Sequence, residues 1–84
     1  MIMQIFAVYD TASGSFARPM FVASRGVALR VFSDEVNRKA DDNMLFNHPE
    51  DFQLFHLGSY DDHDGSIKPL EKALRAATAS EVKV

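Results

Sequence analysis

The chain contains no cysteine among its 84 residues. This absence excludes disulfide bonds, thiolate catalysis and zinc sites that depend on cysteine. A domain of this size removes only about 60% of the surface of its unfolded chain from water, so a core alone stabilises it weakly. The sequence therefore predicts one domain over residues 1–80, stabilised by assembly into a homodimer or a higher homo-oligomer.

The first 22 residues have the pattern of a β-hairpin. Residues 3–9 and 16–22 are rich in strand-forming side chains, and a turn-forming segment, Asp10–Gly14, separates them. Pro19 has no backbone N–H to give to a neighbouring strand. We therefore expect residues 16–22 to form an edge strand.

An amphipathic helix is predicted from Ser24 to Arg38. Ser24 is a favourable N-cap residue, and apolar side chains recur on one face at helical spacing. These are Ala28, Leu29, Phe32 and Val36. This face should pack against the sheet.

The second half of the chain predicts a third strand, a turn and a short final helix. Residues 52–60 are apolar on both faces, which indicates a central strand, and an acidic turn follows at Asp61–Gly65. We expect a short fourth strand at Ser66–Lys68, a helix beginning at Pro69, and a frayed tail over residues 81–84.

These elements define an α+β fold in which a small antiparallel sheet has the ββαβ(β) order and the strand order 2-1-3. One amphipathic helix packs on the sheet, and the predicted C-terminal helix is too thin to cover the other face. A second subunit is the simplest cover for that face. The residues expected at this oligomer interface are Phe6, Phe16, Phe21, Val27, Val31 and Phe55.

Candidate metal and catalytic motifs are weak. When Asp61–Gly65 is compared with a calcium loop, Tyr60 stands where the first carboxylate ligand is needed. The histidines at 48, 56 and 63 lack the short spacing of zinc ligands. No nucleophile elbow and no glycine-rich phosphate loop occurs. The sequence predicts a protein that is not an enzyme, with no cofactor and no metal.

The distribution of charge is uneven, although the net charge is only −3. Residues 41–64 contain seven acidic residues and no Lys or Arg, whereas residues 1–39 contain five basic residues. Such groups are ordinary solvated surface unless they gather on one face. If the protein binds DNA, the phosphates should contact Arg18, Arg25, Arg30, Arg38 and Lys39.

Three segments resemble a known family. They are Ile5–Asp10 (IFAVYD), Phe32–Asn37 (FSDEVN) and His48–Asp62 (HPEDFQLFHLGSYDD). Together they are similar to the small non-structural protein of gokushovirus-type microviruses, which are single-stranded DNA phages. The resemblance covers about residues 2–68, and residues 69–84 do not contribute.

The resemblance implies an accessory role in viral DNA replication or single-stranded genome synthesis, in the cytoplasm of the host cell. Two kinds of partner stay open at this point. The protein could bind single-stranded DNA weakly and without sequence preference as a homodimer, or it could be an interaction module for a phage or host replication protein. No apolar run is long enough to predict a membrane span.

Overall fold

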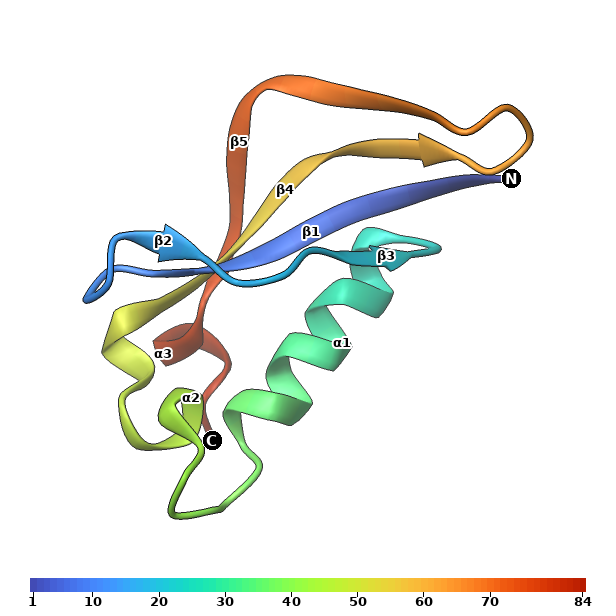
Figure 1. The fold of residues 1–84 in the computed structure, drawn as a ribbon. Helices are drawn as coiled ribbons and strands as arrows, with labels where there is room; N and C mark the ends of the chain where they lie inside the picture. Colours follow the sequence, from blue (N-terminus) through green and yellow to red (C-terminus); the bar gives the residue numbers. More distant parts are fainter.

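Strand β1 (Ile2–Asp10) is the centre of an antiparallel sheet. In the computed structural model, which describes residues 1–84, the strand order is β2-β1-β4-β5, and β3 also pairs with β1. The other strands are β2 (Ser15–Phe16), β3 (Met20–Val22), β4 (Phe52–Asp61) and β5 (Ser66–Thr78). The sheet curls, and the β4–β5 hairpin extends away from the helices (Figure 1).

Helix α1 (Arg25–Val36) covers one face of the sheet. The Ser24 hydroxyl accepts a hydrogen bond from the Val27 N–H at 3.3 Å, which confirms the predicted N-cap. The predicted apolar face is also confirmed, because three of its members are buried and Leu29 packs against them. The core joins α1 to β1 and β4 through Phe6, Ala28, Phe32, Val36, Phe52 and Leu54.

Three short helical turns complete the helical side of the molecule. They are α2 (Met44–Asn47), η1 (Pro49–Asp51) and α3 (Ala79–Val82). α2 and α3 lie together near the C-terminus, below the sheet (Figure 1). None of the helices has the length and the apolar character that a membrane crossing requires.

The predicted α+β class with an antiparallel sheet is confirmed, but the strand order and two element assignments differ. The return strand of the hairpin is broken at residues 17–19 into β2 and β3, because Pro19 interrupts the ladder. α1 ends at Val36 rather than at Arg38.

The helix predicted from Pro69 is wrong, because this segment belongs to β5. β5 pairs with β4 on both sides of residues 70–73, and this non-local pairing prevails over the weak helical pattern. The register changes from His56↔Leu74 to Gly58↔Pro69, so residues 70–73 stand opposite Leu57 alone. The strand bends sharply in this region (Figure 1). The short C-terminal helix exists, but it is α3.

Gly58 is required by the close approach of β4 and β5. A Cβ atom at this position would lie 2.5 Å from the Lys68 carbonyl oxygen and 2.8 Å from the Pro69 Cα. Both atoms belong to the backbone, so neither can rotate away. Glycine is the residue that lets the two strands pair here.

The C-terminal residues contact the helical layer. Thr78 and Glu81 form a reciprocal capping box at the start of α3. The Asn37 side chain donates to the Val82 carbonyl at 3.0 Å and accepts from the Val84 N–H at 2.9 Å. Lys83 Nζ donates to the Phe46 carbonyl at 2.9 Å and lies 3.3 Å from the centroid of the Phe46 ring. Residues 81–84, expected to fray, have these contacts in the structure.

Candidate nucleic-acid interface

The face of the sheet opposite α1 carries two groups of aromatic side chains. Residues paired across antiparallel strands point to the same side of the sheet, so the register assigns each aromatic residue to a face. Tyr9 pairs with Phe16, and Ala7 pairs with Phe55. Ile5 pairs with Phe21. We call this surface the helix-free face.

The first aromatic group is Tyr9, Phe16 and Phe55. The ring centroids of Tyr9 and Phe16 are 4.8 Å apart, and those of Phe16 and Phe55 are 5.6 Å apart. The second group is Phe21 and Tyr60, with ring centroids 5.5 Å apart and an interplanar angle of 79°. These are the tilted and edge-to-face arrangements that aromatic rings prefer.

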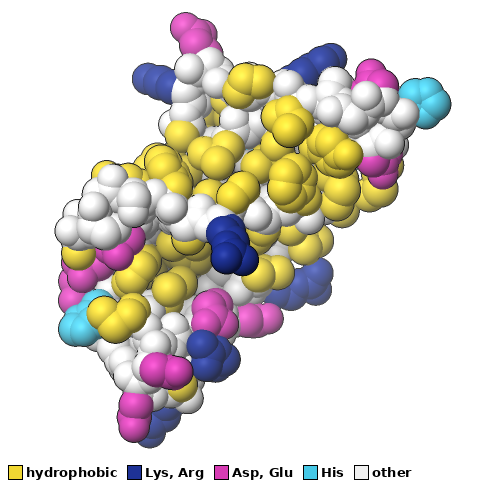
Figure 2. Space-filling view, viewed as in Figure 1, with side chains coloured by type: hydrophobic (Ala, Val, Ile, Leu, Met, Phe, Trp, Pro, Cys, Tyr) yellow, Lys and Arg dark blue, Asp and Glu magenta, His cyan; other side chains and the backbone are white.

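These rings shield the sheet but are themselves in contact with solvent. Ile5 and Ala7 are buried beneath them, whereas Phe16 is 45% exposed and Phe21 is 44% exposed. Hydrophobic side chains form a broad band across the sheet in Figure 2. The helix-free face is thus an open, apolar surface with several ring edges and faces accessible.

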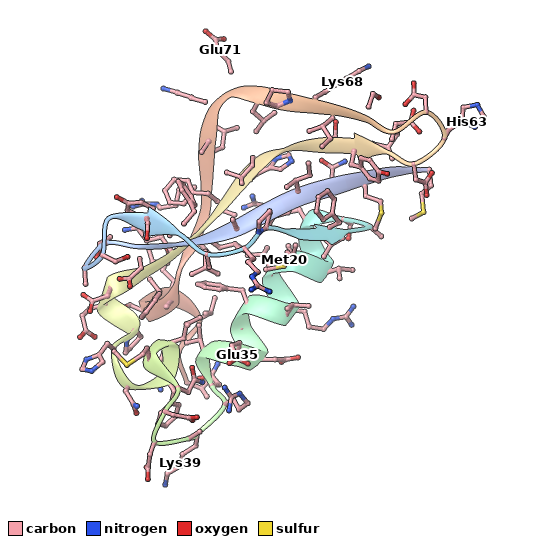
Figure 3. The ribbon with its side chains drawn as sticks, in the orientation of Figure 1. Met20, Glu35, Lys39, His63, Lys68 and Glu71 are labelled. Atoms are coloured by element: carbon pink, nitrogen blue, oxygen red, sulfur yellow. The ribbon has the colours of Figure 1, made fainter.

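Positive charge borders this surface on β5. Arg75 pairs in register with Phe55, so its side chain lies on the helix-free face, and it is exposed. Lys68 and Lys72 are exposed on the same strand, which has Glu71 as its one acidic residue. Lys68 pairs with Ser59, which pairs with Gln4, so the register places the Lys68 side chain on the α1 side of the sheet. Lys68 and Glu71 project outward from β5 in Figure 3. The sequence interpretation did not place Arg75 beside this face, because it predicted a helix beginning at Pro69.

The five basic residues predicted to contact DNA lie on separate elements. Arg18 is exposed between β2 and β3, and Arg30 is exposed on α1. Arg25 begins α1, and its Nη2 donates to the Ala76 carbonyl at 3.2 Å. Arg38 and Lys39 lie beyond the other end of α1, about 20 Å away at the rise of an α-helix. The structure does not bring these five residues into one patch.

Arg38 is already engaged by an acidic neighbour. Its Nη2 lies 2.6 Å from Glu35 Oε1, and its Nε donates to both carboxylate oxygens. The hydrogen bond from Arg38 lowers the pKa of Glu35, and the same contact raises the pKa of Arg38. The charge of Arg38 is therefore largely balanced within this end of the helix.

The residues predicted for an oligomer interface are divided between the two faces. Phe16, Phe21 and Phe55 lie on the helix-free face, where a partner could reach them. Phe6 does not: it is 1% exposed, lies in the core and stacks on His56 with ring centroids 4.6 Å apart. Its assignment to an interface is incompatible with this structure, because the alternation of β1 turns it toward α1.

The flank of α1 supplies the other two predicted interface residues. Val27 is partly buried, and Val31 is 46% exposed. Val31 stands at the edge of a groove beside α1, where it is accessible to a binding partner.

The acidic turn between β4 and β5 has the structural role that its sequence predicts. Asp61 Oδ1 accepts from the His63 N–H, and Asp64 Oδ1 accepts from the Ser66 N–H, both at 3.0 Å. Hydrogen bonds from Ser66 lower the pKa of Asp64. Gly65 has a φ of 75°, the left-handed conformation that this turn requires.

The potential metal ligands come together only in part. His48, Glu50 and Asp51 place ligand atoms within 4.8 Å of one another around η1. His56 is directed elsewhere: its Nε2 lies 2.9 Å from Gln4 Oε1 and 3.1 Å from the Gly58 carbonyl oxygen. Exposed acidic groups of this kind are common without an ion, and we assign no metal function to them.

Comparison with known proteins identifies one family. The family model described as Phage ORF5 protein matches residues 3–82, which is nearly the whole chain. No curated protein and no solved structure gives a match. The family match supports a small, phage-encoded protein, in agreement with the phage origin that the sequence motifs imply. This chain belongs to the Phage ORF5 protein family.

Proposed function

We propose that this phage protein binds single-stranded DNA through the helix-free face of its sheet, as an accessory protein in viral DNA replication or single-stranded genome synthesis. The observation that supports the proposal is the pair of accessible aromatic groups, with the cation Arg75 of β5 on the same face. Unpaired bases stack on aromatic side chains, while nearby cations contact the phosphates.

The chemistry of the face favours single strands over duplexes. The bases of a duplex are stacked on each other and present no free ring surface to Tyr9, Phe16 or Phe55. Stacking on an aromatic side chain contributes about 1–3 kcal/mol per base and is tolerant of sequence. Binding should therefore have little sequence preference.

Few phosphates can be neutralised by one copy of the chain. Arg75 lies on the helix-free face, and Lys68 and Lys72 lie farther along the same strand. With so few cations and a net charge of −3, the affinity of one copy should be weak. Two copies acting as a homodimer on one DNA strand, each using its own aromatic face, would bind more tightly through avidity.

The test is fluorescence anisotropy with a labelled oligo-dT of about 20 nucleotides, enough to span more than one site of the usual size, and the corresponding duplex, at two salt concentrations. Phe16→Ala with Phe55→Ala removes two stacking surfaces. At about 1–3 kcal/mol for each, affinity for oligo-dT should fall at least about 30-fold. The control is Arg30→Glu, because Arg30 lies on α1, away from this face; this variant should bind nearly as the parent does.

A charge variant tests the second half of the proposal. Arg75→Glu should weaken binding and reduce the dependence of log K on log salt by about 0.7 for each phosphate that is no longer neutralised. If the parent binds neither DNA form at low salt, the interaction-module function replaces this proposal. If the aromatic variants bind as the parent does, the helix-free face is not the DNA site.

A further inference from the structure

A groove lies on the α1 side of the sheet, between α1 and the segment that contains β2 and β3. It consists of two adjoining hollows with volumes of about 610 and 330 Å³, which share Val8, Glu35 and Leu45 as lining residues. Met20 on β3 and Glu35 on α1 mark its two sides (Figure 3). Its apolar lining in the larger hollow consists of Val8, Met20, Val31, Phe32 and Leu45.

The wall opposite the sheet is fixed by a buried asparagine. Asn43 is 4% exposed, and its Nδ2 donates to the carbonyls of Glu35 and Arg38, both at 2.8 Å. Its Oδ1 accepts from the Leu45 N–H at 3.2 Å. These bonds attach α2 to the end of α1 and so hold the Leu45 side of the groove in place.

The rim of the groove is acidic. Asp34 and Glu35 line the larger hollow, and Asp10 lines the smaller one. The single basic residue of the lining, Arg38, is paired with Glu35. Asp34 forms no ion pair, and the carboxylate of Asp10 accepts only the N–H of Ala12, at 2.9 Å. Two acidic side chains thus face the groove without a counter-charge.

We propose that this groove binds a cationic amphipathic segment of a partner protein. Apolar side chains of the segment would fill the hollow between Val31 and Met20, and a Lys or Arg on either side would pair with Asp34 and Asp10. Charge complementarity selects this occupant, because the acidic rim attracts a basic segment and repels acidic segments and DNA phosphates. Phe16 lines the smaller hollow as well as belonging to the helix-free face, but the larger hollow shares no residue with that face, so the proposal does not depend on DNA binding.

The probes are two labelled amphipathic peptides of about three helical turns, one built from Leu and Lys and the other from Leu and Glu. Anisotropy measures affinity, and ¹⁵N–¹H spectra of the labelled protein locate the site. The Lys peptide should bind at least about tenfold more tightly than the Glu peptide, because like charges across an interface are unfavourable. It should shift the amide signals of Val8, Met20, Val31 and Leu45, while the signals of Tyr60 and Ile67 stay in place.

Two groove variants and one surface control complete the test. Val31→Lys places a charge on the exposed apolar side and should abolish binding of the Lys peptide. Asp10→Asn with Asp34→Asn should weaken it roughly two- to 30-fold, as expected for the loss of two exposed ion pairs at about 0.2–1 kcal/mol each. Asn at position 10 can still accept the Ala12 N–H, so the turn is preserved. Ile67→Lys, at a side chain that is 60% exposed on β5, should change nothing.

Three results would overturn the proposal. The first is equal affinity for the two peptides, and the second is unchanged binding by Val31→Lys in a folded protein, as judged by its melting temperature. The third is a parent chain that sediments as a dimer while Val31→Lys sediments as a monomer, because the groove would then hold a second copy. Retention on oligo-dT should be the same for Val31→Lys and the parent, which separates this site from the DNA site.

Discussion

Replacing Gly58 with alanine tests whether the β4–β5 approach limits the stability of the fold. The new Cβ would lie 2.5 Å from the Lys68 carbonyl oxygen, and ordinary contact begins at 3.4 Å. The backbones of the two strands must therefore separate by about 0.9 Å, the difference between these distances. Overpacking of this kind in a well-packed site costs about 1–3 kcal/mol. A domain of this length has a free energy of unfolding of only about 4–13 kcal/mol.

The assay is urea denaturation together with thermal unfolding, followed by circular dichroism. Each kcal/mol of destabilisation should lower the melting temperature by about 4–8 °C in a domain of this size. Gly26→Ala is the matched control, because a Cβ there would meet only the Ser24 hydroxyl oxygen, at 3.8 Å. Ala is also the better helix former, so the control should be as stable as the parent or more so. A Gly58→Ala protein as stable as the control would refute the argument from close approach.

Two further predictions concern polar groups. Asn43→Ala leaves the Glu35 and Arg38 carbonyls without their buried donor, and should cost about 1–3 kcal/mol in urea denaturation. Asn47→Ala, at an exposed side chain, should cost less than about 0.5 kcal/mol; equal losses of stability would contradict the special role of Asn43. Glu81 has a pKa below its ordinary value of 4.5 because the Thr78 N–H donates to it. A lowered folded-state pKa stabilises the protein above the ordinary value, and this contribution disappears as pH falls through the folded pKa. The Gln side chain of Glu81→Gln does not titrate. Lowering the pH from neutral to about one unit below 4.5, the ordinary pKa of Glu, should therefore change the urea midpoint of this variant less than that of the parent. Identical changes would show that this carboxylate does not contribute.

Local signals in the sequence are sufficient for much of the first 65 residues. The N-cap at Ser24 and the acidic turn depend on hydrogen bonds within a few residues, and their patterns predict them directly. The stripe on α1 is visible in the sequence as a helical repeat of apolar residues, although its burial comes from packing against β1 and β4. The edge position of residues 16–22 follows from the missing N–H of Pro19 in the same way. The structure confirms each of these features, apart from the break within the edge strand.

β5 could not be predicted because its conformation is determined by a distant partner. Proline is common in the first turn of a helix, and Pro69 is followed by apolar residues at helical spacing. This local pattern predicts a helix when the pairing with β4 is not known. Pairing with β4 gives the facing backbone groups of the two strands hydrogen-bond partners and prevails over that signal. The position of Arg75 opposite Phe55 depends in turn on the irregular register of this pairing, so the basic border of the aromatic face was also beyond sequence reasoning.

The bend in β5 affects how copies of this chain meet at high concentration. β5 is a 13-residue strand whose outer backbone has no partner, and a straight edge of that length would be a template for adding strands from other molecules. Residues 70–73 leave the ladder and divide the edge into two shorter lengths, and Pro69 removes one donor beside the bend. Lys68 and Lys72 add charge on either side of Pro69. The irregular pairing of β5 thus also opposes fibrous aggregation.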